Sequence, residues 1–263
     1  MAAGGFALLA GTLAFSATAA EFGPTNPFYA LSGLPFQAPP LDKLKDVDYQ
    51  PPIEAGMAQQ IREIDALARD PAAATFENTI VAMEKTGLLL ERALDTFRAV
   101  SQANTNPTLQ AAKTALAPKL AAHQDAIHLN ESLFRRVEAI FKKRESLQLD
   151  PESLRLVEVV YDRFVRAGVN LPETDKARLR KLNEEASALA DAFTTKLLDA
   201  TMDAAFGTTD QAALAGLSDA QIAAAAQTAR DRGVPGYVIP LQNTTQQPGL
   251  VSLSERATRA AIF

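Results

Sequence analysis

The 263-residue sequence contains no cysteine, which excludes disulfides, thiol nucleophiles and thiolate metal ligands together. It also excludes the cysteine to which a bacterial lipid anchor is attached. A glycine-rich phosphate loop and the Gly-x-Ser-x-Gly elbow of serine hydrolases are missing as well. We therefore expect side-chain packing to hold the fold together, and we expect neither nucleotide binding nor serine hydrolysis.

Basic residues are too few to give the chain a positive field. The formal net charge is -5 and the pI is about 5.2, so phosphate backbones and anionic bilayer surfaces are poor partners. Nucleic acid is not expected to bind. With 47% hydrophobic residues the chain is long enough to bury one large core or two smaller ones.

Residues 1–20 are apolar and end in small residues, with Ala17-Thr18-Ala19 matching the pattern that signal peptidase accepts. They predict a signal peptide cleaved after Ala19 or Ala20 and a periplasmic protein, with a buried or anchoring N-terminal segment as the alternative. No basic residue precedes Lys43, so the true signal is expected to begin upstream of Met1. No membrane contact beyond the signal is expected.

Prolines divide the next 32 residues from the rest of the chain. Their density over residues 21–52 excludes a helix and predicts an extended lead-in. Four apolar side chains are expected to pin this lead-in to a helical surface: Phe28, Tyr29, Leu34 and Phe36.

From residue 53 the apolar spacing changes to that of long helices, which predicts a helical domain over 53–206. Capping residues next to good first-turn residues place helix starts near 107, 131 and 151. The remaining predicted helices are 54–68, a second that begins near Thr75 and carries apolar residues to Phe97, and a sixth over 172–202. The sixth has one apolar stripe: Leu179, Leu182, Ala186, Leu189, Phe193 and Leu197.

Residues 207–263 indicate shorter elements that begin a further segment. The spacing predicts an extended piece at 203–207, a helix at 218–232, a strand at 237–241 and a last helix at 250–263 that stops without a cap. Asn243-Thr244-Thr245 matches a glycosylation sequon, but we interpret it as a polar turn after the strand. The fold class is therefore mainly α, with a small strand pair near residues 203–241.

The histidines do not form a zinc motif. A zinc peptidase usually carries two histidines at i and i+4 of one helix with a glutamate between them. His123 and His128 lie five residues apart, about 140° around a helix, and neither is followed by glutamate. We interpret them as ordinary helix residues, and acidic clusters such as Glu184-Glu185 and Glu152 to Glu158 as solvated faces or ion pairs. No catalytic or metal-binding residue is assigned.

Several phrases nevertheless resemble the N-terminal region of the bacterial peptidyl-dipeptidases, also called dipeptidyl carboxypeptidases, of the thimet oligopeptidase family. The resemblance covers nearly all of residues 25–263. The phrases that carry it are Asn26–Phe28, Leu34–Phe36, Thr75–Ile80, Arg144–Leu147, Leu149–Val159, Arg163–Gly168, Ile239–Pro248 and Arg256–Arg259.

The resemblance implies the N-terminal lobe of a two-lobed, helical zinc metallopeptidase with a deep channel that removes C-terminal dipeptides from short peptides. In such enzymes a His-Glu-x-x-His helix and a downstream glutamate, all in the C-terminal portion, bind the zinc. The resemblance therefore implies that this chain binds no zinc itself and is inactive alone. It also implies that the chain forms one wall of the channel beside a missing C-terminal lobe.

Two other interpretations stay open. The chain could be a non-catalytic periplasmic binding or adaptor module, in which case all its apolar stripes should be covered, whereas a severed lobe should expose an apolar patch. A metal-independent hydrolase has no positive feature in its favour. The sequence leaves the peptide preference and the oligomeric state undetermined.

Overall fold

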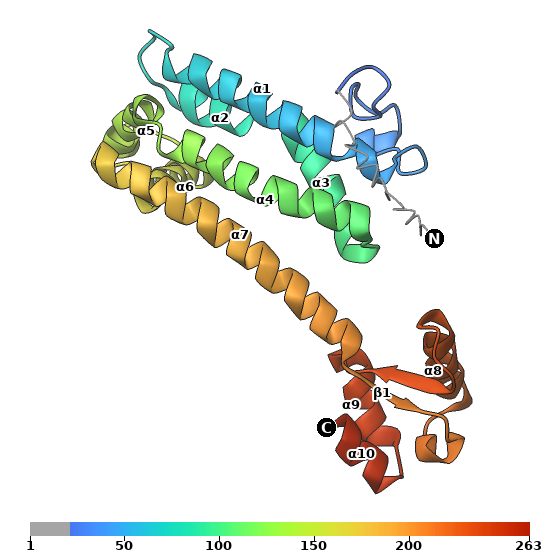
Figure 1. Ribbon diagram of the computed structural model, residues 1–263. Helices are drawn as coiled ribbons and strands as arrows, with labels where there is room; N and C mark the ends of the chain where they lie inside the picture. Colours follow the sequence, from blue (N-terminus) through green and yellow to red (C-terminus); the bar gives the residue numbers. More distant parts are fainter. Residues whose placement is uncertain (1–21) are drawn as a thin grey trace, which may run out of the picture. The chain divides into compact units, whose positions relative to one another are not determined.

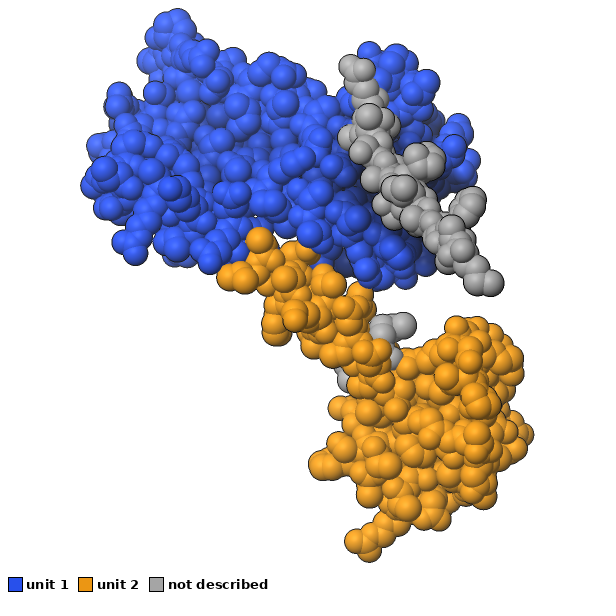
Figure 2. Space-filling view, in the orientation of Figure 1, with its two compact units in different colours: residues 1–187 blue, residues 188–263 orange. Residues whose placement is uncertain are grey.

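The computed structural model describes residues 22–263, so the predicted signal peptide over 1–20 lies outside the described residues. The chain folds into two compact units, residues 1–187 and 188–263 (Figure 2). Helix α7 (Glu173–Asp203) runs across the boundary between them. The predicted class, mainly α with a small strand pair, is confirmed.

Unit 1 is a set of packed helices (Figure 1). Three of the predicted helix starts are confirmed, because Asn106, Asn130 and Asp150 each accept a hydrogen bond from a backbone N–H of the following turn. The helices before α7 are α1 (Gln50–Ala68), α2 (Ala82–Glu84), α3 (Leu88–Ala103), α4 (Pro107–His128), α5 (Glu131–Lys143) and α6 (Pro151–Ala167).

The prediction of one continuous helix from Thr75 to Phe97 is wrong. A π-helical turn over Phe76–Val81 leads into the short α2, the chain turns at Lys85–Gly87, and α3 then begins. Gly87 has a φ of 75°, a left-handed backbone that favours glycine. The apolar spacing continues across this turn, but the residues on its two sides pack in different cores: Ile80 in one and Leu90 in the other.

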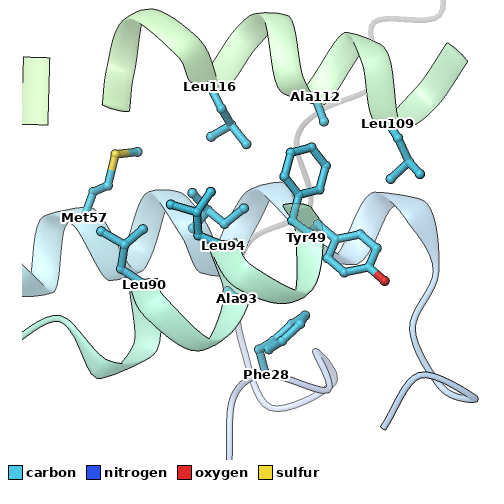
Figure 3. Close-up of a cluster of buried hydrophobic side chains, with 11 residues drawn as sticks. Phe28, Tyr49, Met57, Leu90, Ala93, Leu94, Leu109, Ala112 and Leu116 are labelled. Atoms are coloured by element: carbon cyan, nitrogen blue, oxygen red, sulfur yellow. The ribbon is translucent and has the colours of Figure 1, made fainter. Parts of the chain in front are cut away.

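Two apolar cores lie within unit 1. The first joins α1, α3 and α4 to the lead-in, whose Phe28 and Tyr49 rings lie 5.9 Å apart (Figure 3). The second joins the end of α1 to the π-helical turn, α4, α5 and α6. Because α1 supplies Ile53 to the first core and Ile64 to the second, it is an element that both cores share.

The lead-in is pinned by one of the four predicted side chains. Phe28 is buried, and its backbone carbonyl accepts a hydrogen bond from Arg92 of α3 (2.8 Å). Tyr29, Leu34 and Phe36 are exposed, so the prediction is wrong for these three. Short turns of Pro35–Gln37 and Asp46–Asp48 shape the path of this segment.

Unit 2 pairs two short strands, β1 (Ala205–Thr208) and β2 (Tyr237–Pro240), antiparallel with Phe206 opposite Ile239. The pair confirms the predicted small sheet. Helices α8 (Asp219–Asp231), α9 (Asn243–Ser252) and α10 (Arg256–Ile262) pack with it. Their shared core contains Leu214, Ala225, Ile239, Leu253 and Ile262.

Two predictions for the end of the chain are wrong: a single helix over 250–263 and a polar turn at 243–245. Helix α9 already begins at Asn243, and the helical path breaks at Leu253 before α10. The break lets Leu253 enter the core of unit 2, while the N–H of Ser254 donates to the carbonyl of Ala215 (2.8 Å). A tertiary contact therefore outweighs the helical spacing.

Helix α7 occupies almost the predicted range, but its apolar stripe is not buried. Leu179 is partly buried, whereas Leu182, Leu189, Phe193 and Leu197 are exposed. Among residues 22–263, no helix combines the length and the apolar character needed to cross a membrane.

A close approach of two helices within unit 1 predicts a stability effect. A Cβ atom at Gly56 of α1 would lie 2.7 Å from the Cα of Leu90 in α3. Gly56→Ala should therefore lower the free energy of unfolding by about 1 to 3 kcal/mol, the usual cost of overpacking. Alanine also favours a helix over glycine by about 1 kcal/mol, and we expect the overpacking cost to be the larger of the two. Urea denaturation followed by circular dichroism measures the difference.

The control is Gly33→Ala, because a Cβ there would meet no atom within 4 Å. Its midpoint should stay close to that of the unsubstituted chain. An unchanged or raised midpoint for Gly56→Ala would show that α1 and α3 do not pack this closely.

Candidate functional site

The side chain of His123 belongs to a hydrogen-bonded network that links three elements. On α4, His123 is buried, and its Nε2 lies 2.7 Å from Oε1 of Gln60 on α1. Nε2 of Gln60 lies 3.1 Å from the hydroxyl of Thr86, in the turn before α3. The Thr86 hydroxyl donates to the carbonyl of Met83 (2.8 Å).

The direction of each bond follows from that last contact. A carbonyl only accepts, so the Thr86 hydroxyl gives its hydrogen to Met83 and must accept from the amide nitrogen of Gln60. The carbonyl oxygen of Gln60 then accepts from His123, which places the hydrogen of this imidazole on Nε2. Nδ1 of His123 is a bare acceptor, buried and without a hydrogen-bond partner among the described residues.

Gly87 allows this network to form. A Cβ at Gly87 would lie 2.4 Å from Cδ of Gln60, and its left-handed φ already disfavours other residues. The N–H of Gly87 donates to Glu63 of α1 (2.8 Å). Gln60 and Glu63 therefore fix the α2–α3 turn onto α1, which is a structural role.

His128 lies about one and a half turns further along α4 in a different setting. Its Nδ1 donates to the carbonyl of Gln124 (3.0 Å), and its ring lies 5.3 Å from that of Phe164 on α6. Burial lowers its pKa; the bond to Gln124 opposes this, Arg163 adds to the lowering, and Asp125 opposes it. Burial also lowers the pKa of His123, helped by the neighbouring His128. Both shifts favour the neutral imidazole.

These residues do not fit a zinc site. His123 lines a groove beside Glu54 and Lys119, whereas His128 lines a separate hollow with Arg163. The groove is crossed by an ion pair between Lys119 and Glu54 (2.6 Å), whose carboxylate is thereby engaged. Across residues 22–263, no three histidine, cysteine, aspartate or glutamate side chains gather so that they could hold a metal ion.

The hollow beside His128 is too small for a peptide. Its volume is about 130 Å³, whereas sites for small-molecule ligands usually measure about 300 to 1,000 Å³. A second hollow, of about 210 Å³, lies between α8, β2 and α9 and has a mostly apolar lining that includes Leu217, Ile239 and Pro248. Neither places an acid, a base and a nucleophile side by side.

The acidic clusters singled out in the sequence lie on helix surfaces. Glu158 forms ion pairs with Arg155 (2.8 Å) and Arg144 (3.9 Å), and Glu184 and Glu185 are exposed on α7. Sequence reasoning missed Gln60 and Gly87, because an isolated glutamine and an isolated glycine carry no pattern of their own. Among residues 22–263, we assign a catalytic role to no side chain.

Two of the phrases that carry the family resemblance, Thr75–Ile80 and Leu149–Val159, contain helix starts. Thr75 and Asn78 cap the π-helical turn reciprocally, with Asn78 N–H donating to the Thr75 hydroxyl (3.0 Å). Arg136 of α5 also donates to Asn78 (3.1 Å). Asp150 caps α6 by accepting hydrogen bonds from the backbone N–H groups of Glu152 and Ser153 (3.0 Å each). These phrases therefore specify where helices begin and how they connect.

Comparison with known proteins finds relatives that are peptidases. It is 45% identical over 240 residues to the dipeptidyl carboxypeptidase of Salmonella typhimurium, covering 91% of this chain. It is 44% identical over 239 residues to the dipeptidyl carboxypeptidase of Escherichia coli, covering 90% of it. The chain is a relative of the dipeptidyl carboxypeptidases. Oligopeptidase A of Haemophilus influenzae is more distant, 24% identical over 91% of the chain. No family model matches.

The chain spans about a third of the length of these relatives. The matched region is 35% of each dipeptidyl carboxypeptidase and 34% of the Haemophilus oligopeptidase A. About two thirds of a dipeptidyl carboxypeptidase therefore have no counterpart in these 263 residues.

The lowered pKa values of the two histidines predict a pH dependence of stability. In the unfolded chain a histidine takes up a proton near pH 6.5, whereas the lowered folded pKa keeps His123 and His128 neutral below that pH. The unfolded state then binds more protons, so the free energy of unfolding should fall as the pH drops from about 7.5 to about 5.5. Urea midpoints measured across this range test the sign.

His123→Gln should flatten this fall, and the double change with His128→Gln should flatten it further, since these are the two histidines of the chain. The comparison is between slopes and not between absolute stabilities, because His123→Gln also removes a hydrogen bond. A variant at His123 with the full slope would mean that this imidazole is not held neutral.

Proposed function

We propose that this chain is the N-terminal, zinc-free part of a secreted zinc metallopeptidase that removes C-terminal dipeptides from short peptides. The observation that carries the proposal is the 45% identity to a dipeptidyl carboxypeptidase over 91% of the chain but 35% of that protein. In this proposal the zinc ligands and the general-base glutamate lie in the other two thirds. The chain forms one wall of the substrate channel.

The surroundings of the histidines support an inactive chain. His123 gives its Nε2 hydrogen to Gln60, and His128 gives its Nδ1 hydrogen to Gln124. Each ring therefore has a structural partner, and the two line different hollows. Zinc, when bound by the whole enzyme, would activate water for attack on the peptide; the residues of this chain would shape access to it.

The exposed apolar surface favours this proposal over a self-contained adaptor. A binding module that folds and acts alone should bury its apolar stripes. On α7, however, four large apolar side chains are exposed: Leu182, Leu189, Phe193 and Leu197. The lead-in exposes more, including Tyr29, Leu31 and Phe36. A chain that normally packs against more protein accounts for both surfaces.

The proposal predicts activity only in a full-length context. The test uses this chain, Escherichia coli dipeptidyl carboxypeptidase, and a chimera in which the 239 matched residues of that enzyme are replaced by those of this chain. The chimera should release dipeptides from an N-terminally blocked tetrapeptide with a free C-terminus and should leave folded proteins intact. The chain alone should release none, with or without added zinc.

Two results would contradict the proposal. Zinc-dependent release by the 263-residue chain itself would mean that it holds metal ligands that we have not assigned. A chimera that folds, as judged by circular dichroism and a cooperative thermal transition, but cleaves nothing would mean that this chain cannot serve as that part of the enzyme.

Export is a separate part of the proposal, supported by Ala17-Thr18-Ala19 after an apolar run. Expression in a Gram-negative host behind an added basic n-region should yield a periplasmic protein that begins at Ala20 or Glu21. N-terminal sequencing of the osmotic-shock fraction checks this. An intact N-terminus in the cytoplasmic fraction would contradict it.

A further inference from the structure

Within unit 1, the first part of helix α7 packs on its neighbours through polar side chains. Lys176 is completely buried, and its Nζ lies 2.5 Å from Oε1 of Glu131, the first residue of α5. About two turns further along, Nδ2 of Asn183 donates to Oδ1 of the buried Asp125 on α4 (2.8 Å). The bond to Lys176 lowers the pKa of Glu131. The side of α7 that faces α4 and α5 is therefore held by an ion pair and by a hydrogen bond from a side-chain amide.

A different side of the same helix is apolar and uncovered. We call Leu182, Ala186, Leu189, Phe193 and Leu197 the α7 stripe. Their spacing of 4, 3, 4 and 4 residues places them in one row along the helix. The four large members are between 49% and 68% exposed.

Such a row differs from the scattered exposed apolar residues of ordinary surfaces. Single exposed leucines need no explanation, but a contiguous apolar row marks an interaction site. From Leu182 to Leu197 the row is about 22 Å long, at about 1.5 Å per residue. That length suits the packing of another helix or strand along it.

We propose that the α7 stripe is the surface on which the remaining two thirds of a full-length dipeptidyl carboxypeptidase pack. This inference rests on the proposed function. The length of the relatives indicates what would cover the stripe, because about 65% of a dipeptidyl carboxypeptidase lies outside the region matched by this chain. An apolar row that this chain leaves open becomes a buried interface in the longer protein.

The charges around the stripe do not suit a lipid surface. Helices that lie on anionic membranes carry a polar face rich in lysine and arginine. The exposed charges of α7 between residues 178 and 199 are balanced, with Arg178, Lys181 and Lys196 against Glu184, Glu185 and Asp199. Charges of mixed sign at the border of an apolar row are typical of a protein interface.

The absence of cysteine from the chain makes a direct test possible. Leu189→Cys and Phe193→Cys, made one at a time, place a thiol on the stripe. Ala188→Cys and Ala192→Cys are the matched controls: both positions are exposed, and each lies one residue earlier, about 100° around the helix. Each variant is made in this chain and in the chimera with the Escherichia coli enzyme.

The measurement is the rate of maleimide labelling of the cysteine-containing peptide, followed by mass spectrometry so that other thiols do not interfere. Stripe positions should react quickly in the chain alone and at least about 100-fold more slowly in the folded chimera. Control positions should react at similar rates in both proteins.

Three outcomes would overturn the proposal. Equal labelling of stripe positions in the chain and in the chimera would show that the stripe stays open. Slow labelling of stripe and control positions alike would show that α7 is enclosed as a whole. Protection in the chain alone that grows with protein concentration would assign the stripe to a second copy. Because labelling does not depend on catalysis, an inactive chimera would count against the proposed function and not against this interface.

Discussion

Because Gly56 has no side chain, the backbone of α3 at Leu90 lies directly against α1, and the rest of unit 1 is arranged around this contact. Helix α1 supplies Ile53 and Met57 to one core and Ile64 to the other, so its position determines both. One turn beyond Gly56, Gln60 reaches the α2–α3 turn through Thr86 and reaches α4 through His123. Close backbone approach and a buried polar network thus act at the same point.

The buried polar groups give unit 1 a specific arrangement of helices. A buried polar atom that lacks its partner costs about 1 to 3 kcal/mol, so each helix is favoured in the one place where its partners lie. Arg136 binds the carbonyls of Asp70 and Ala72 across the loop after α1, and Lys176 places α7 against Glu131. Apolar side chains alone would tolerate sliding of one helix along another.

Helix α7 relates the fold to the proposed function. Polar contacts of Lys176 and Asn183 hold its first part to α5 and α4, while the α7 stripe is exposed. A helix that packs by polar side chains reverses the usual arrangement. Here Lys176 forms an ion pair with Glu131, and Asn183 donates a hydrogen bond to Asp125. In the proposed enzyme, the exposed row of this helix would pack against the rest of the protein. The histidines contribute to stability in the same unit, and in the proposed enzyme metal chemistry falls to residues outside the chain.

Local sequence patterns predict the helical class, the starts of α4, α5 and α6, the span of α7 and the pair of strands, because capping residues and apolar spacing act over a few neighbouring residues. Tertiary structure decided the turn at Gly87, the break at Leu253 and the exposure of Phe36. For the turn and the break, the deciding partner is distant in sequence: Gln60 lies against Gly87, and the carbonyl of Ala215 accepts from Ser254. Tertiary structure also decided which side of α7 is covered, because apolar spacing shows that a helix has an apolar side and only its neighbours determine whether that side is buried.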